Sequence, residues 1–251
     1  LDTTLSDLNR FPLRLSDLVV LEVDQDAPEK VVWSSGAEYR ITDLPAVGFS
    51  GDYYHRPAFI HGQWIEFQGC VMFIDPSGKG LDETAYSIVA HLNGNLFVLE
   101  VGSFREGYTE PVLRGIAEAA KRRKVKLILL EDQFGQGMME NLLQPYLREI
   151  YPCTIEPTRS NVQKERRIIN ALEPVMNQHR LIFNRSVIED DSKARDDDSV
   201  ETALAYQLFH QLTHLTVDKQ SLQHDDRLDS LAGAVQYWNE SLAIDEDRAI
   251  K

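Results

Sequence analysis

The stretch that most constrains this fold is a short apolar run that ends in a carboxylate, residues 71–75. Pro76, Ser77 and Gly78 follow it and stop regular structure, so the pattern predicts a buried strand that ends at Asp75. A charge at the end of such a strand lies at the rim of a sheet and is costly to bury without a partner. Taken alone, the same pattern also fits an Asp that begins a turn by bonding its own backbone.

Two more strands are predicted directly after this one. Residues 84–92 and 96–104 are rich in apolar and aromatic side chains, and the Asn93-Gly94 pair between them is a hairpin signal. Because such tight connections join antiparallel neighbours, we expect three consecutive antiparallel strands. The first of them carries Asp75 at its end.

A helix is predicted over residues 109–124, because apolar positions recur there at helical spacing and Thr109 is a suitable N-cap. A fourth strand over residues 125–130 then runs into Glu131. A crossover helix normally places the next strand parallel to an earlier one. If that strand lies beside the first, Asp75 and Glu131 leave the sheet at one edge, where the ligands of such sheets gather.

The rest of the chain is expected to alternate helices with short strands. Helices are predicted over residues 135–151, 162–178 and 200–216 and from about residue 225, strands over residues 18–23, 30–33, 153–155 and 181–184, and a solvated acidic loop over residues 189–198. Residues 1–70 alternate poorly and show no catalytic pattern, so we interpret them as an appended or linking region with short strands. Residues 71–251 are then the main domain.

A third group of acids begins the last predicted helix, in the sequence HDDRLDSLAGAV from residue 224. Asp225 and Asp229 are four residues apart and Asp226 and Asp229 are three apart, so each pair lies on one helical face. The small residues at 232–234 would let this helix approach a sheet closely. Acids in a first helical turn also favour the positive end of the helix, and this structural explanation fits the group equally well on its own.

Three separate groups of acids, two at strand ends and one at a helix start, indicate a site of oxygen ligands for Mg²⁺ or Mn²⁺. Cys70 and Cys153 are the only cysteines, too few for a cysteine-based metal site. With 26 Lys plus Arg against 40 Asp plus Glu, the net charge of −14 argues against a nucleic-acid partner, since phosphate binding needs positive charge. A bound divalent ion makes the effective charge of an acidic pocket positive, so the net charge of the chain does not exclude nucleic acid from binding at the site itself.

The pattern FIDPSG … LLEDQFGQG … HDDRLDSLAGAV resembles the nuclease domain of the large terminase subunit of tailed bacteriophages, above all the DNA-packaging terminases (DNA maturases) of short-tailed phages. The resemblance covers about residues 70–240. It implies an α/β, ribonuclease H-like (integrase/resolvase-like) fold with a mixed central sheet, three antiparallel strands followed by parallel strands, flanked by helices. It also implies two Mg²⁺ or Mn²⁺ ions as cofactors. The catalytic and metal-binding residues that it implies are Asp75, Glu131, Asp226 and Asp229, with Asp225 as a further ligand or a helix cap.

By this resemblance the chain is an endonuclease that cuts concatemeric double-stranded viral DNA during genome packaging, with little sequence specificity. No G-x-x-x-x-G-K-[ST] motif occurs, so the packaging ATPase of such subunits is expected to be absent here, with residues 1–70 following it. The implied partners are double-stranded DNA, that ATPase domain, the small terminase subunit and the portal of the procapsid, in the cytoplasm of the host cell. No membrane is expected, because no run approaches the roughly 18 apolar residues of a membrane span.

Four basic residues are predicted to contact DNA: Lys79, on a glycine-flanked turn near Asp75, and Lys164, Arg166 and Arg167 at the start of a predicted helix. For the last three, an ordinary exposed basic face is an equally good explanation. Two other functions stay open: a non-catalytic docking module of the packaging motor, and another ribonuclease H-like nuclease such as a junction resolvase. Dependence on a divalent metal separates an endonuclease from the docking module, and substrate choice separates it from a resolvase.

Overall fold

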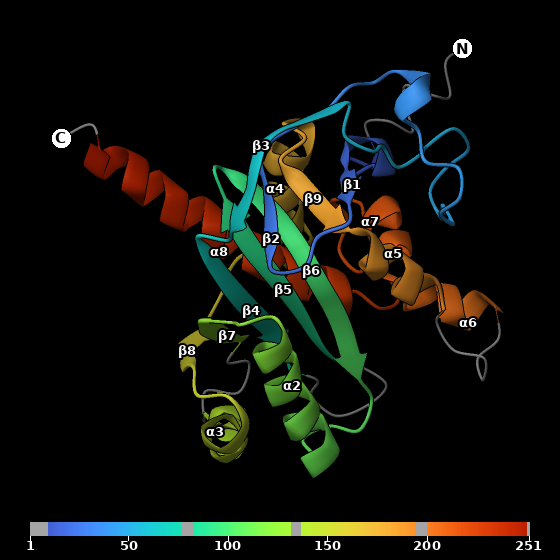
Figure 1. Cartoon of the computed structure of the whole chain (residues 1–251). Helices are drawn as coiled ribbons and strands as arrows, with labels where there is room; N and C mark the ends of the chain where they lie inside the picture. The colour runs from blue at the N-terminus through green and yellow to red at the C-terminus, as the bar shows by residue number, and fades with distance from the viewer. Residues whose placement is uncertain (1–9, 77–82, 132–136, 194–199, 250–251) are drawn as a thin grey trace.

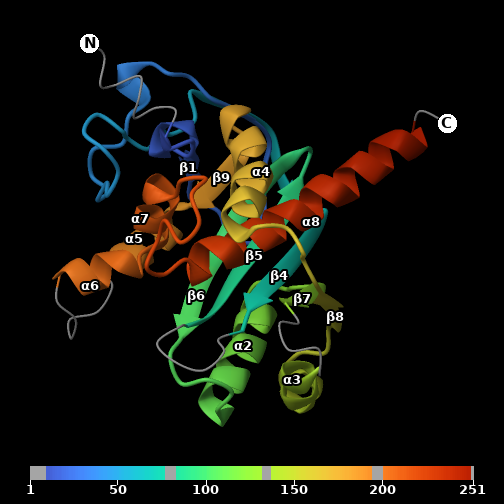
Figure 2. The same cartoon turned by 180° about the vertical axis from the view of Figure 1, so that it is seen from behind.

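The structure, a computed structural model, describes residues 10–76, 83–131, 137–193 and 200–249. They form a seven-stranded sheet with helices on both faces and a separate two-stranded ribbon (Figure 1, Figure 2). The strands are β1 (Val19–Leu21), β2 (Asp26–Val32), β3 (Phe59–Glu66), β4 (Gly69–Asp75), β5 (Thr84–Leu92), β6 (Asn95–Phe104), β7 (Leu127–Glu131), β8 (Thr154–Thr158) and β9 (Leu181–Asn184). The helices are α2 (Glu110–Arg122), α3 (Met138–Ile150), α4 (Lys164–Asn177), α5 (Arg185–Ser192), α6 (Val200–Ala205), α7 (Leu208–His214) and α8 (Asp226–Ala249). Within the described ranges, none of the helices combines the length and the apolar character needed to cross a membrane.

The centre of the sheet is the predicted antiparallel arrangement of β4, β5 and β6. In the strand order β1-β9-β6-β5-β4-β7-β8, these three are antiparallel neighbours, and parallel pairs lie on both sides of them. Asn93 and Gly94 connect β5 to β6 with positive φ angles of 49° and 81°, which this tight hairpin turn requires. The predicted mixed sheet, with three antiparallel strands followed by parallel ones, is therefore confirmed.

Strand β4 is buried on both faces, and its alternation decides where its last side chain points. Met72 and Ile74 belong to the core under α2 and α3, whereas Val71 and Phe73 belong to the core under α4 and α8. Successive side chains of a strand point to opposite faces. Asp75 therefore lies on the face of the sheet that α4 and α8 cover.

Strand β7 lies parallel to β4, as predicted, with Ile74 paired to Leu130. Leu129 contributes to the core under α4 and α8, and Glu131, two residues further along β7, lies on the same face. On β4, Asp75 directly follows Ile74, just as Glu131 directly follows Leu130 on β7. The two carboxylates therefore emerge from neighbouring strands on the face that α8 covers, which confirms the predicted placement of the fourth strand beside the first.

Helix α8 crosses this face close to the sheet (Figure 2). A Cβ atom on Gly233 would lie only 2.4 Å from the ring of Phe73, so a glycine is needed at this crossing. Further along the helix, Trp238 Nε1 donates a hydrogen bond to the carbonyl oxygen of Val89 at 3.0 Å. The small residues at 232–234 thus bring α8 against β4 and β5, as predicted, and place its first turn near the ends of β4 and β7.

Residues 10–70 contribute to the same structure. Strand β1 pairs with β9 at one edge of the sheet, and Leu15, Leu18 and Tyr54 lie in the core under α4 and α8. Strands β2 and β3 form the separate antiparallel ribbon. The sequence did not indicate β3, because its residues FIHGQWIE do not alternate and most of its side chains are exposed. The division of the chain at about residue 70, with an appended region before it, stays a prediction.

Two predictions in the C-terminal half are wrong. The helix predicted over residues 200–216 is divided into α6 and α7, and residues 189–192, predicted as loop, lie in α5. A buried carboxylate on α5 explains why α7 begins as a separate helix. Asp191 accepts the backbone N–H groups of Leu208 and Phe209, at 2.9 and 3.2 Å, and so satisfies donors that the start of α7 leaves unpaired. This partner lies 17 residues upstream of α7, where a local pattern cannot show it.

Candidate metal centre

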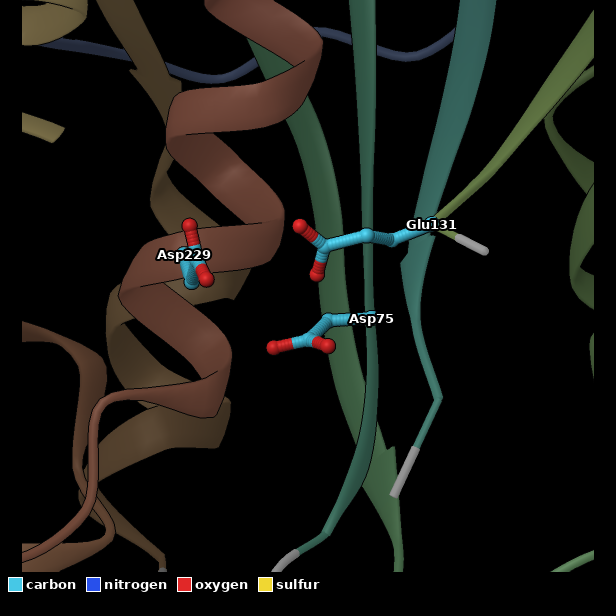
Figure 3. Close-up of side chains that lie close together, drawn as sticks. All are labelled: Asp75, Glu131 and Asp229. Atoms are coloured by element: carbon cyan, nitrogen blue, oxygen red, sulfur yellow. The ribbon is translucent and has the colours of Figure 1, made fainter. Parts of the chain in front are cut away.

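Three carboxylates from three elements converge at one edge of the sheet. Asp75 ends β4, Glu131 ends β7 and Asp229 lies in the first turn of α8. One oxygen atom of each lies within 4.8 Å of the others. Figure 3 shows the two strand carboxylates extending toward the helix that carries Asp229. We use the name metal centre for this candidate site, which comprises these three residues and the basic side chains that contact them.

The carboxylates of the metal centre are withdrawn from solvent. Asp75 is 2% exposed and Asp229 1%, while Glu131 is partly buried. Burial raises the pKa of Asp75 well above its usual value, and the nearby charge of Asp229 raises it further. Burial also raises the pKa of Asp229, although Lys164 and Arg167 oppose the rise. Buried like charges are costly, so this cluster requires cations close to it.

Lys164, the first residue of α4, supplies one cation. Its Nζ lies 2.8 Å from Asp225 Oδ1, 3.0 Å from Asp229 Oδ2 and 3.8 Å from Asp75 Oδ2. Burial alone would lower the pKa of Lys164, but the carboxylates around it together raise that pKa above its usual value. The ammonium group therefore stays charged. Its side chain is 35% exposed, so solvent reaches it.

Arg167, three residues further along α4, supplies the second cation. Its Nη2 donates to both oxygens of Asp229, at 2.7 and 2.9 Å, and lies 3.4 Å from Glu131 Oε1. Arg167 is 9% exposed. Residues three apart share one helical face, so Lys164 and Arg167 reach the same cluster. Lys164 joins Asp229 to Asp75, and Arg167 joins Asp229 to Glu131.

The other two acids near the start of α8 lie at the margin of this cluster. Asp225 contacts Lys164 and has a side chain that is 25% exposed. Asp226 is buried, and its Oδ2 accepts the backbone N–H of Glu83 at 3.2 Å. Asp226 and Asp229 are three residues apart but have different neighbours: Asp226 accepts the N–H of Glu83, whereas Asp229 contacts Lys164 and Arg167. The assignment of Asp225 and Asp226 to a metal stays a prediction.

The predicted DNA-binding residues have different surroundings. Lys79 lies outside the described residues, and Arg166 is exposed on α4. Lys164 and Arg167 contact the carboxylates, a role that the sequence analysis did not assign to them. Their spacing of three residues signals a shared face, but the sequence of α4 does not show that this face meets α8.

Sequence comparisons give a consistent result. The family model described as the ribonuclease H-like domain of the bacteriophage T7 terminase matches residues 74–181. The large terminase subunit of Enterobacteria phage T3 is 35% identical over 246 residues, which cover 98% of this chain and 42% of that protein. The chain thus spans less than half the length of this relative.

Solved structures with a similar arrangement include two terminase nuclease domains. The human cytomegalovirus domain, soaked with manganese and bound to an inhibitor, has a TM-score of 0.47 at 12% identity and covers 68% of this chain and 82% of its own. A mutant nuclease domain from the large terminase subunit of the bacterial virus Sf6, with manganese and beta-thujaplicinol, has a TM-score of 0.48 at 11% identity. The match covers 68% of this chain and 90% of the Sf6 chain. The assignment of this chain to a protein family rests on its sequence identity to the T3 subunit, and the family model agrees with it.

Proposed function

This chain belongs to the large terminase subunits of bacteriophages and contains their ribonuclease H-like domain, and from this premise we propose that it is a divalent-metal-dependent endodeoxyribonuclease. Membership of this family supports a nuclease as the class of enzyme. The observation that carries the proposal is the convergence of Asp75, Glu131 and Asp229 from β4, β7 and α8. This convergence supports the proposal that phosphodiester hydrolysis takes place at these residues.

The donor set of the metal centre fits Mg²⁺ or Mn²⁺. It consists of carboxylate oxygens, the ligands that these hard ions prefer, held in a buried site that already attracts two cations of the chain. We propose that Asp75, Glu131 and Asp229 hold two such ions during cleavage, with Asp225 and Asp226 as further ligands. Asp75 and Glu131 lie on adjacent strands, so the sheet fixes their separation before an ion arrives.

The residues of the centre have separate tasks in this proposal. Asp75, Glu131 and Asp229 would hold the ions, which would supply an activated water and positive charge for the attacking and leaving oxygens. Asp75 and Asp229 present carboxylates in a nearly solvent-free site, where fixed charges act strongly. Burial raises the pKa of Asp75, and a divalent cation beside it would favour the ionised carboxylate that holds the ion. Lys164 is charged and partly exposed, so it can donate to a phosphate oxygen of the strand being cut.

We propose the substrate and partners that the resemblance to the terminase family implies. The substrate is concatemeric double-stranded viral DNA, cut during genome packaging with little sequence specificity. The partners are the packaging ATPase domain, the small terminase subunit and the portal of the procapsid, in the host cytoplasm. With a net charge of −14 this chain attracts DNA weakly, so partners that hold the DNA close by are part of the proposal.

A plasmid-cleavage assay of this chain tests the proposal. Supercoiled plasmid should become nicked and linear with Mg²⁺ or Mn²⁺ and stay intact with EDTA. The exposed acid Asp190 on α5 offers a matched control, since Asp190→Ala should cleave like the wild type. Intact plasmid under all these conditions would favour the docking module, and cleavage confined to four-way junctions would favour the resolvase.

A further inference from the structure

We infer that two exposed segments beside the metal centre form a surface that holds duplex DNA, with two valines against the minor groove and two cations against phosphates. The segments are residues 159–163, between β8 and α4, and residues 216–220, between α7 and α8. We call this surface, which comprises Arg159, Val162, Val217 and Lys219, the valine surface. This inference rests on the proposed function, since DNA is the substrate only if the chain is a nuclease.

Both segments lead to the metal centre. Thr158, the last residue of β8, is paired with Glu131 in the sheet, so Arg159 begins the first segment beside that carboxylate. The same segment runs into Lys164, whose ammonium contacts the buried carboxylates of the centre. The second segment runs toward Asp225, which lies 2.8 Å from the same ammonium. A duplex with its scissile phosphate at the metal centre therefore passes close to both segments.

A buried glutamate holds the two segments together. Glu165, in the first turn of α4, is 7% exposed and accepts the backbone N–H of Gln220 at 2.6 Å and the side chain of Gln163 at 3.2 Å. Gln163 Nε2 also donates to the carbonyl oxygen of Val217, at 3.2 Å. The segments are thus fixed relative to each other before DNA arrives, so binding loses little conformational entropy at this surface.

Val162 and Val217 are the exposed apolar side chains of the two segments, with exposed fractions of 59% and 55%. Single exposed apolar residues are common on proteins, but these two lie on segments that Gln163 joins, and both segments border the metal centre. A valine side chain has neither donor nor acceptor. It can therefore pack against sugars and base edges in the minor groove without distinguishing the bases, which fits cleavage with little sequence specificity.

The charges of the valine surface favour DNA over an apolar protein partner. The two segments carry Arg159 and Lys219, both exposed, against one acid, Asp218, in a chain whose net charge is −14. Asp218 Oδ2 accepts the hydroxyl of Thr216, at 3.3 Å within the same segment. A local excess of positive charge on an acidic chain suits the phosphates that flank a minor groove.

Fluorescence anisotropy of a labelled duplex, in EDTA to prevent cleavage, tests the surface. Val162→Ser combined with Val217→Ser should weaken binding about tenfold without changing the slope of log affinity against log salt, because apolar contacts release no counterions. Lys219→Gln should weaken binding a few-fold and lower that slope by about 1. Ile244→Ser, at a residue of α8 that is 52% exposed, is the matched apolar control and should bind like the wild type.

Titration with Mn²⁺ separates this role from a structural one, and circular dichroism checks the fold. The double valine variant should bind Mn²⁺ like the wild type, and its plasmid cleavage should fall at limiting DNA and recover at saturating DNA. Wild-type affinity for DNA in this variant would overturn the inference and leave the surface to a protein partner. Weakened Mn²⁺ binding would assign the valines a structural role and overturn it as well. Failure of the proposed function looks different, because the wild type itself would not cleave plasmid with Mn²⁺.

Discussion

Two groups of buried charges flank the start of α8, and they combine the same residue types in different proportions. In the metal centre, three converging carboxylates share two cations. In the second group, which we call the paired group, Arg227 contacts both Glu83, at 3.3 Å, and Asp191, at 2.9 Å. Arg105 lies 3.6 Å from Glu83 as a second cation. The paired group thus has one cation for each acid.

The paired group also uses backbone donors, from the start of α7. Asp191 accepts two N–H groups at the start of α7 as well as Arg227. Burial raises the pKa of Asp191, as it raises that of Asp75, so a raised pKa does not separate the two groups. The proportion of acids to the basic side chains in the ion pairs described above separates them: two acids and two cations in the paired group, three acids and two cations in the metal centre. The larger share of carboxylate in the metal centre suits an added cation.

The largest expected difference between the groups concerns catalysis. Asp75→Ala should reduce metal-dependent plasmid cleavage by at least about two to three orders of magnitude, because each lost tenfold corresponds to about 1.4 kcal/mol and a metal supplies several. Its stability should hold or rise slightly, since one of several crowded like charges is removed. Cleavage at the wild-type rate by a purified, folded variant would remove Asp75 from the site. Marked unfolding would instead identify Asp75 as a structural residue.

The paired group should show the opposite behaviour in Arg227→Met. The side chains of Glu83 and Asp191 are 1% and 7% exposed, so removing their shared partner leaves two buried charges without it. Breaking a buried pair in this way costs about 3–5 kcal/mol in the free energy of unfolding, measurable by urea denaturation. Arg105→Met, at a side chain that is 47% exposed, is the control and should cost less than about 1 kcal/mol. Equal losses in the two variants would contradict the paired description.

Added metal should stabilise the protein through the metal centre alone. An ion that binds only the folded state adds about 2.7 kcal/mol at a concentration 100 times its dissociation constant, so millimolar Mn²⁺ should raise the melting temperature. The rise should shrink in Asp75→Ala and Asp229→Ala and persist in Asp190→Ala, which removes an exposed acid. Equal rises in all four proteins would mean that Mn²⁺ acts on the general acidic surface.

The pH dependence of stability sharpens the same contrast without metal. Because the folded-state pKa of Asp75 lies above its unfolded value, the folded protein binds the proton more tightly. Stability from this group is therefore present at low pH and is lost as pH rises from about 4 through the folded-state pKa. In EDTA, Asp75→Asn should thus become more stable relative to the wild type as pH rises, measured by urea denaturation. A difference that stays constant from pH 4 to pH 8 would contradict the raised pKa.

The sequence predicted the part of the metal centre that depends on strand pattern. Asp75 and Glu131 follow apolar runs that end in turns or acids, which predicted that both leave the sheet at one edge if their strands are neighbours. The observed register and cores then place both on one face. The approach of α8 was also predictable, because the small residues at 232–234 leave room for Phe73. These signals are local, so a single stretch of sequence contains each of them.

The cations of the centre could not be assigned in the same way. Lys164 and Arg167 were predicted to contact DNA, because basic residues at a helix start suit phosphate, and nothing in α4 reveals which of its faces meets α8. Likewise, the different surroundings of Asp226 and Asp229 could not be predicted, because the backbone N–H that bonds to Asp226 comes from Glu83, far away in the sequence. The centre joins β4, β7, α4 and α8, and such long-range contacts leave no local pattern.

The smallest expected effect falls on Arg166, the exposed neighbour of a buried cation. If Arg166 contacts a DNA phosphate, as predicted, Arg166→Gln should weaken binding a few-fold for all sequences alike and lower the slope of log affinity against log salt by about 1. Fluorescence anisotropy with duplexes of different sequence, across a series of salt concentrations, measures both quantities. Lys30 on β2, an exposed cation on the separate ribbon, provides the control as Lys30→Gln. An unchanged slope in Arg166→Gln would show that Arg166 belongs to an ordinary exposed basic face of α4. Arg166 would then be a solvated cation, in contrast to Arg167, which contacts the carboxylates of the metal centre.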